Sequence, residues 1–167
     1  QWRNSGGNLG EFGTGVDQLA DVLKTLKEDP YARRHIISSW NPIELKEMAL
    51  PPCHVLCQFY VGPKGLSCQL YQRSGDIGLG VPYNVTSYAL LTHLIAKEIG
   101  LPAYELIHVI GDTHIYEDHI EPLTQQLQRK PFPFPKLHIK NFKSIFDFKF
   151  EDIELIDYKT HGPIKMT

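Results

Sequence analysis

One apolar segment, residues 85–99, restricts the fold of this chain more than any other feature. Its tyrosine, leucine and isoleucine residues recur at helical spacing, and further alanine and leucine residues lie off that stripe. The pattern predicts a helix that is buried on most of its sides and that ends at Gly100 and Pro102. Strand candidates stand before and after it in the chain, at 55–61, 66–71 and 106–110.

The other segments alternate between helix and strand signals. Helices are predicted at 16–28 and 116–129, a short helix begins at 41–44, and strands are predicted at 35–40, 136–139 and 148–156. A four-residue hairpin loop is expected at 62–65, an irregular segment at 73–82 and an extended linker at 131–135. Because strands and helices are intermixed without regular β-α-β order, the sequence predicts an α/β fold of the α+β type, with a mixed β-sheet covered by helices.

Composition excludes several classes of protein. The 167 residues suit one domain, and the hydrophobic and charged fractions, 42% and 22%, are those of a globular protein. A net charge of -2 argues against bulk nucleic-acid binding or attraction to an anionic membrane. No apolar run approaches the ~20 residues of a membrane span. The chain begins with Gln1, so we expect the true N-terminus, with any targeting signal, to be absent.

The chain has three cysteines, Cys53, Cys57 and Cys68. The odd number and the lack of a Cys-x-x-Cys pair predict neither a disulfide framework nor a zinc knuckle. Reduced thiols in a cytosolic protein are the simplest interpretation. One thiol is then available as a nucleophile, and the other two are packing residues.

Cys53 follows two prolines at the start of a predicted strand, which could hold its thiol in one orientation at a pocket edge. A nucleophilic cysteine needs a neighbouring cation, and this segment alone favours a buried structural cysteine instead. His54 is a poor base for Cys53, because neighbouring side chains of a strand point to opposite faces.

Two short segments carry groups that could bind an anion. Residues 71–76 combine an arginine, a serine and a glycine, which suit a phosphate cradle; the alternative is a surface turn with an arginine–aspartate pair. Arg33 and Arg34 stand at a strand entrance, where they face solvent, nearby acids or a phosphate.

Asn84 precedes the main helix, where an N-cap role is favoured; the functional alternative is that its amide pairs with the edge of a flat ring. His114 and Tyr116 follow a predicted strand, a position where loops often contact ligands. His114, Asp118 and His119 match no common zinc spacing, so no metal site is predicted.

Taken in chain order, these motifs resemble the thymidylate synthase family from Gln1 to about Pro163. The matching blocks are Asp29-Pro30-x-x-Arg33-Arg34, Trp40-Asn41-Pro42, Leu50-Pro51-Pro52-Cys53-His54, Gln58-Phe59-Tyr60-Val61, Leu66 to Asp76, Leu79-Gly80-Val81-Pro82-Tyr83-Asn84, Gly111-Asp112-x-His114-x-Tyr116, Pro135-Lys136-Leu137 and Phe150-Glu151-Asp152. The resemblance implies reductive methylation of dUMP to dTMP by 5,10-methylenetetrahydrofolate, which becomes dihydrofolate. The folate donates both carbon and hydride, so neither a metal, a flavin nor a nicotinamide is required.

The same resemblance assigns roles to residues. Cys53 is similar to the nucleophile that adds to carbon 6 of uracil, and Arg73 to an arginine that binds the phosphate and favours ionisation of the thiol. Gln72 and Ser74 resemble further nucleotide contacts, Ser74 at the phosphate. Asp76 resembles a residue that orients both the folate and the pyrimidine. With Asn84, the implied catalytic set is Cys53, Arg73, Asp76 and Asn84.

Other implied contacts lie outside that set. His114 and Tyr116 resemble the residues that bind the ribose hydroxyls. Arg33 and Arg34 resemble a pair that reaches the phosphate in the partner's site, which implies an obligate homodimer joined sheet to sheet in the cytoplasm.

Asn84 selects the base. Uracil offers an acceptor at oxygen 4 and a donor at nitrogen 3, and an asparagine amide complements both. Related enzymes that hydroxymethylate deoxycytidylate carry aspartate at this position. Since a buried polar mismatch costs about 1–3 kcal/mol, deoxyuridylate is predicted and deoxycytidylate hydroxymethylation is the alternative.

The chain departs from the family pattern at its ends. The N-terminal third of the family sequence, with a phosphate-binding arginine loop and an active-site glutamate, has no counterpart, and the small apolar C-terminal ending is missing. We therefore expect residues 1–167 to be a single catalytic domain that lacks this third and is inactive alone. A non-catalytic dimerisation or RNA-binding module is a further alternative, which the absence of a basic stripe disfavours.

Overall fold

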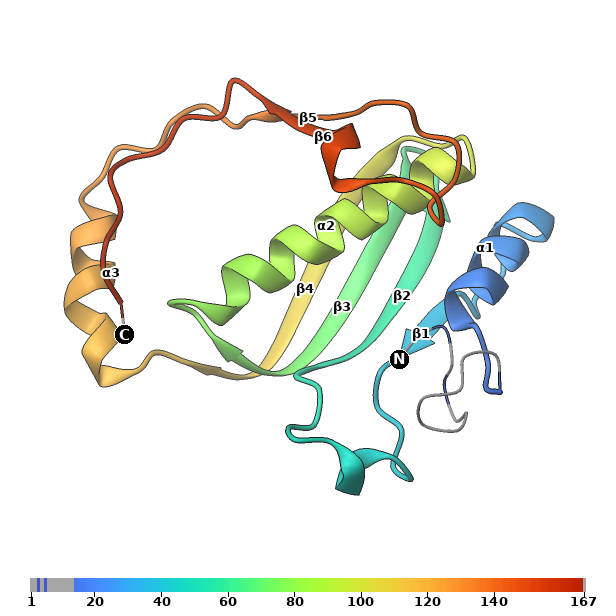
Figure 1. Cartoon of the computed structure of the whole chain (residues 1–167), viewed down its shortest axis with the longest axis horizontal. Coiled ribbons are helices and arrows are strands. Elements are labelled where there is room, and N and C mark those ends of the chain that lie inside the picture. The colour runs from blue at the N-terminus through green and yellow to red at the C-terminus, as the bar shows by residue number, and fades with distance from the viewer. Residues whose placement is uncertain (1–2, 4, 6–13, 167) are drawn as a thin grey trace. The chain divides into compact units, whose positions relative to one another are not determined.

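The computed structural model describes residues 3, 5 and 14–166. The chain forms two compact units that divide after His114. Figure 1 labels the elements of both units, and each unit is described by itself. The expectation that residues 1–167 form a single catalytic domain stays a prediction.

The first unit is built on a mixed four-stranded sheet in the order β1-β2-β3-β4 (Figure 1). Its strands are β1 (Ile36–Ser38), β2 (His54–Gly62), β3 (Gly65–Asp76) and β4 (Ala103–His114). The pairs β1–β2 and β2–β3 are antiparallel, and β3–β4 is parallel. The mixed sheet of the predicted fold class is confirmed, although β3 and β4 are longer than the sequence pattern indicated.

The turn between β2 and β3 is tighter than predicted. Gly62 pairs directly with Gly65, so Pro63 and Lys64 alone form the loop. Gly65 has a φ of +131°, and a Cβ atom there would lie 2.2 Å from the carbonyl oxygen of Pro102. Only glycine allows both this conformation and this close approach.

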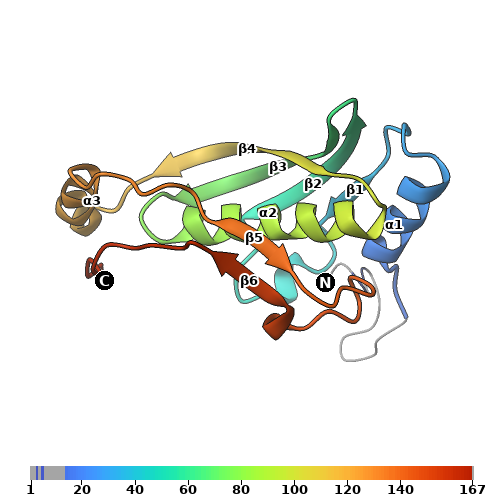
Figure 2. The ribbon, with the colours of Figure 1, turned by 90° about the horizontal axis from the view of Figure 1, so that it is seen from above.

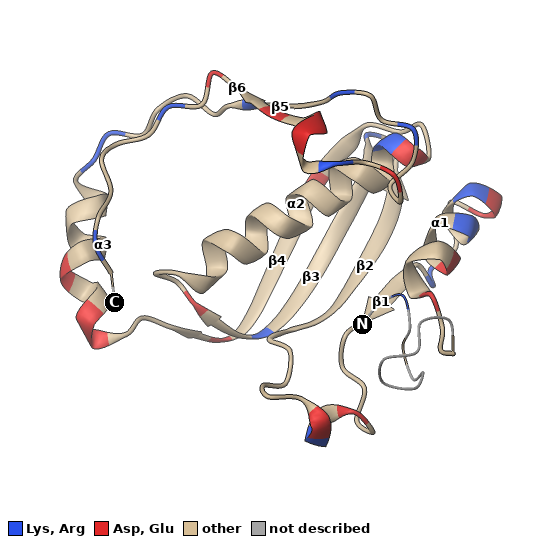
Figure 3. Ribbon diagram, viewed as in Figure 1, with Lys and Arg blue, Asp and Glu red and all other residues tan. Residues whose placement is uncertain are grey.

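Helix α2 (Gly80–Glu98) lies across one face of the sheet, as Figures 1 and 2 show from two directions. It connects the parallel strands β3 and β4. Figure 3 shows no charged residue along it before Lys97. The buried residues of α2 all lie from Tyr88 onward, whereas residues 82, 83 and 85–87 are exposed, so the predicted burial on most sides is wrong for the first half of the helix. The helix begins five residues before the predicted start at Val85, because Pro82 is tolerated in a first turn. The predicted irregular segment 73–82 is therefore wrong.

The face of the sheet toward α2 forms the core with helix α1 (Gln18–Glu28). Phe59 and Leu70 are at most 1% exposed. Asp17 caps α1 by accepting a hydrogen bond from the N–H of Ala20. The predicted helix 16–28 is confirmed from its third residue onward.

The opposite face of the sheet is exposed and partly apolar. Strand alternation places large side chains there that are between 39% and 64% exposed. They are Ile36, Tyr60, Tyr71, Ile107 and Val109.

Between β1 and β2, the predicted short helix is a single 3-10 turn, η1 (Leu45–Glu47). The side chain of Asn41 accepts a hydrogen bond from the N–H of Ile43 at 3.2 Å, and this local bond begins the turn. Pro51 and Pro52 then lead into β2.

The second unit contains helix α3 (Ile120–Leu127) and a two-stranded antiparallel sheet of β5 (Lys136–Ile139) and β6 (Ile153–Ile156). Helix α3 is shorter than the predicted helix 116–129, because a separate 3-10 turn, η2 (Glu117–His119), precedes it. The predicted second tail strand, 148–156, is shortened by a 3-10 turn, η3 (Phe150–Asp152). None of the helices in the described part of the chain is long and apolar enough to cross a membrane.

Candidate functional site

Most of the predicted site residues meet at one end of the sheet. His54 at the start of β2 pairs with Gln72, and Asp76 at the end of β3 pairs with His114 at the end of β4. The backbone N–H of Arg73 donates to the carbonyl of Cys53 at 2.8 Å. Because β3 and β4 are parallel, their carboxyl ends open at the same edge, which is where ligands bind in many sheets of this kind.

Arg73 is held against the segment that precedes Cys53. Its Nε donates to the carbonyl of Pro52 at 3.1 Å and its Nη2 to that of Pro51 at 2.7 Å. The guanidinium carbon lies 5.8 Å from the centroid of the Trp40 ring. Arginine has five N–H donors, so two bonds to carbonyls do not exhaust its capacity to bind an anion. The alternative of a surface turn is wrong, since this segment is part of a long strand.

Cys53 differs from the other two thiols in its exposure. All three cysteines are free; Cys53 is half-buried, while Cys57 and Cys68 are at most 1% exposed. Its place between Pro52 and the start of β2 keeps it outside the packed core. The interpretation of Cys53 as a core residue, which its own segment favoured, is therefore wrong.

Gln72 and Asn84 join β3 to α2. Gln72 is 2% exposed, and its Nε2 donates to Oδ1 of Asn84 at 3.0 Å and to the carbonyl of Ser74 at 2.8 Å. Asn84 lies inside α2, and the N-cap position belongs to Leu79, so the N-cap interpretation of Asn84 is wrong. The amide of Asn84 is instead oriented by a buried partner.

His54 is part of a second polar cluster, which the sequence reasoning did not assign. Its Nδ1 lies 2.8 Å from the hydroxyl of Tyr88 and 3.5 Å from that of Ser39. Burial lowers the pKa of His54, so the neutral imidazole is favoured near pH 7. Tyr88 was predicted only as part of the apolar stripe of the helix, and nothing in that stripe signals its polar contact.

Asp76 closes the turn from β3 to α2. Its carboxylate accepts from the N–H groups of Gly78, Leu79 and Gly80 at 2.9, 3.2 and 3.3 Å. These are N–H groups at the helix N-terminus, and a negative charge there is stabilised. Asp76 thus fixes the distance between the end of β3 and Asn84.

The remaining predicted residues are placed differently. Arg33 and Arg34 are exposed just before β1, and the carbonyl of Arg33 accepts from Nε2 of Gln58 at 3.2 Å. Nδ1 of His114 lies 3.1 Å from a carboxylate oxygen of Asp112. Tyr116 belongs to the second unit and is 55% exposed.

A family model described as thymidylate synthase matches residues 1–167. The chain belongs to the thymidylate synthase family.

Curated relatives agree with this membership. The chain is 55% identical to the thymidylate synthase of Homo sapiens and 54% identical to that of Mycoplasma pneumoniae, covering 99% of this chain and 55% of each relative. It is 52% identical to the bifunctional dihydrofolate reductase-thymidylate synthase of Paramecium tetraurelia, of which it covers 37%. The chain thus spans about half, or less, of the length of these relatives.

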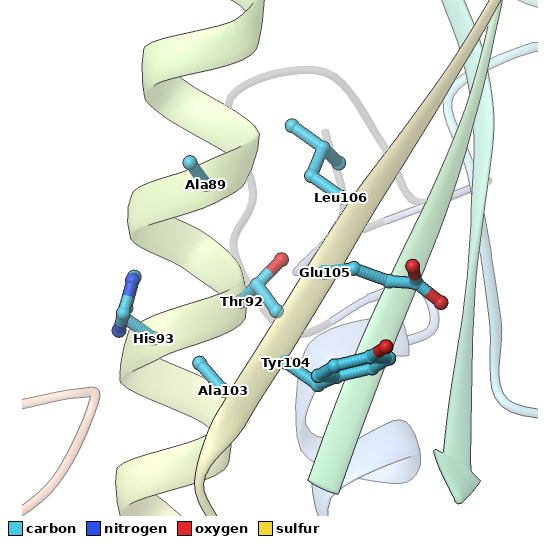
Figure 4. A pocket seen from close by; sticks show the side chains of 7 residues that line it. All are labelled: Ala89, Thr92, His93, Ala103, Tyr104, Glu105 and Leu106. Atoms are coloured by element: carbon cyan, nitrogen blue, oxygen red, sulfur yellow. The ribbon is translucent and has the colours of Figure 1, made fainter. Parts of the chain in front are cut away.

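A small cavity lies apart from these thymidylate synthase motifs. It has a volume of about 80 Å³ and lies between α2 and β4 (Figure 4). Its lining consists of Ala89, Thr92, His93, Ala103, Tyr104, Glu105 and Leu106. Since none of the predicted site residues lines it, the cavity is not part of the candidate site.

Residues 3, 5 and 14–166 contain no group of three or more His, Cys, Asp or Glu side chains placed to hold a metal ion.

Proposed function

We propose that this chain carries the nucleophile and the nucleotide site of an enzyme that methylates dUMP to dTMP with 5,10-methylenetetrahydrofolate, giving dihydrofolate. One observation carries the proposal beyond family membership. The backbone carbonyl of the half-buried Cys53 accepts a hydrogen bond from the backbone N–H of Arg73. The guanidinium of Arg73 donates to the carbonyls of Pro51 and Pro52, the two residues before Cys53. A thiol beside a fixed cation is the arrangement that a nucleophilic cysteine needs.

In the proposed reaction, Cys53 adds to carbon 6 of the uracil ring as its thiolate. Addition makes carbon 5 nucleophilic, and the folate supplies the one-carbon unit and the hydride. Arg73 stabilises the thiolate electrostatically, and Asn84 holds the base by its polar edge. The neutral His54, bonded to Tyr88, offers a group that can hold a proton near the same end of the sheet.

The nucleotide is gripped at its phosphate and its sugar. Arg73 and Ser74 bind the phosphate, since both project from the end of β3 that leads to the site. His114 and Tyr116 bind the ribose hydroxyls.

The folate contact in this chain is Asp76. Its carboxylate already accepts three backbone N–H groups, which hold it in one orientation, and its oxygens can accept from an N–H donor of a flat heterocycle. The residue is compatible with the role, and Asp76 orients the pyrimidine as well as the folate.

We also infer a cytoplasmic homodimer, joined through the exposed face of the sheet. Tyr60 and Tyr71 on that face are 64% and 39% exposed, and an apolar surface of this kind is typical of an interface. Arg33 and Arg34, both exposed, then reach the phosphate in the partner's site.

The test is covalent capture of the nucleotide. The native protein should gain the mass of both ligands when it is incubated with 5-fluoro-dUMP and methylenetetrahydrofolate. The modified peptide should contain Cys53. The Cys53→Ser variant should gain none, while Cys57→Ser should form the adduct normally. An adduct that survives in Cys53→Ser would remove the proposed mechanism.

Two alternatives remain in different classes. Deoxycytidylate hydroxymethylation is disfavoured by Asn84 and would be revealed if dCMP displaced dUMP in competition. An RNA-binding module is disfavoured by the net charge of -2. Filter binding at several salt concentrations would detect it, because release of counterions gives a steep salt dependence.

A further inference from the structure

A chain of two hydrogen bonds leads from β4 to the amide of Asn84. Nε2 of His108 lies 2.8 Å from Oε1 of Gln72, and Nε2 of Gln72 donates to Oδ1 of Asn84 at 3.0 Å. His108 pairs with Leu70 across the parallel strands, so its position is set by the register of the sheet. Its middle member, Gln72, is 2% exposed, while His108 and Asn84 are partly exposed.

The direction of these bonds follows from one group that can only accept. The carbonyl of Ser74 lies 2.8 Å from Gln72, so the atom facing it is the Nε2 donor. Oε1 of Gln72 therefore faces His108, which must donate from Nε2. Burial lowers the pKa of His108, and a neutral ring with its proton on Nε2 meets this requirement.

This direction decides what Asn84 presents to a base. An N–H of Gln72 occupies Oδ1 of Asn84, so the amide is held with its NH₂ group on the other side. In that orientation Asn84 offers a donor for oxygen 4 of uracil and a second lone pair of Oδ1 for the N–H at nitrogen 3. The reversed amide would offer the opposite pattern, which fits the amino group and unprotonated nitrogen of cytosine.

We propose that His108 is a positioning residue for base selection: by donating to Oε1 of Gln72 it acts together with the carbonyl of Ser74 to hold the Asn84 amide in one orientation, and so favours a uracil edge over a cytosine edge. His108 acts through Gln72, without touching the base. The inference rests on the proposed function, because it assigns a specificity role at the same site. It locates part of the uracil preference at a position of β4 that none of the matching family motifs includes.

The test compares dUMP and dCMP binding by calorimetry in the wild-type protein and three variants. His108→Leu removes the donor, and the ratio of the dCMP to the dUMP dissociation constant should fall about tenfold, the size expected for one mispaired neutral hydrogen bond. His108→Gln can still donate and should retain the wild-type ratio. His93→Leu, an exposed histidine on α2, is the control and should also retain it.

The outcomes separate the two levels of the proposal. Equal ratios in wild type and His108→Leu would overturn the positioning role, and so would an equal fall in His108→Gln. If the wild-type protein binds neither nucleotide, the proposed function itself is contradicted, and so is the inference that rests on it. Hydrogen exchange of the Gln72 side-chain amide provides a readout that needs no nucleotide. Exchange should be slow in wild type and in His108→Gln, and faster in His108→Leu.

Discussion

The three cysteines occupy two very different places in the first unit. Cys57 on β2 and Cys68 on β3 point into the core beneath α2, at most 1% exposed, whereas Cys53 stands just before β2, half-buried and next to Arg73. Only a few residues of sequence separate Cys53 from Cys57. The comparison teaches that the reactivity of a thiol here depends on whether it precedes the strand or lies within it.

The hydrogen bond between the two core thiols shifts their pKa values in opposite directions, raising that of Cys57 and lowering that of Cys68. A hydrogen bond to Cys68, followed by burial, raises the pKa of Cys57 far above its ordinary value. A thiol held in this way does not act as a nucleophile.

The largest expected difference is in alkylation. With iodoacetamide under native conditions, Cys53 should react at least about 1,000 times faster than Cys57 or Cys68, because the core thiols react only after an opening that costs several kcal/mol. Peptide mapping by mass spectrometry at timed intervals measures all three rates in one sample. Comparable rates would show that the core of the first unit is open.

Replacing Arg73 should slow the reaction of Cys53 itself. Lysine cannot reach both proline carbonyls with one ammonium group, so Arg73→Lys should reduce Cys53 alkylation near pH 7 by about tenfold. Arg129→Lys, at an arginine whose Nη1 donates to the carbonyl of Gly162 outside the candidate site, is the matched control, and its rate should equal that of wild type. If both variants react alike, Arg73 does not support the thiolate.

Alkaline pH should destabilise the fold through Cys57. Its pKa is raised in the folded state, so the stabilisation is present below the ordinary value near 9 and is lost as the pH rises above it. Between pH 8 and pH 10 the free energy of unfolding should fall by about 1.4 kcal/mol more in wild type than in Cys57→Ala. Urea unfolding at both pH values measures the difference, and equal falls would mean that Cys57 ionises normally in the fold.

The smallest effect concerns packing of the core pair. Cys57→Ala and Cys68→Ala should each lower the free energy of unfolding by about 1 kcal/mol. Since the two thiols are in contact, the double variant should be less destabilised than the sum, by about 0.5 kcal/mol. The 5-fluoro-dUMP adduct on Cys53 should form in all of these variants; loss of the adduct in Cys57→Ala would show that the two environments are coupled.

The sequence predicted the elements whose patterns are local. The apolar helix over 85–99, the hairpin partners of β2 and β3 and the strand at 136–139 all exist, because periodicity and turn residues report directly on them. The start of α2 was missed since its first turn contains Gly80 and Pro82, which read as loop residues when their surroundings are unknown.

The sequence indicated which residues belong to the candidate site, but not the contacts that hold their side chains in place. Cys53 and Arg73 are brought together by the pairing of β2 with β3, and their proximity was expected only from the resemblance to the family. The contact between Gln72 and His108 joins two strands through the register of a parallel pair, and no local pattern encodes that register. The roles proposed for Arg33, Arg34 and Tyr116 stay predictions.

The parallel pairing of β3 with β4 also sets an order of assembly. The β2–β3 hairpin can close around its two-residue loop, whereas Gln72 meets Ile110 only after all of α2 has folded back between them. Contacts between distant residues form late because the intervening chain must first lose its freedom. We therefore expect the edge at which Asp76 pairs with His114 to be completed last, and pulse-labelled hydrogen exchange during refolding should protect β2 amides before those of β4.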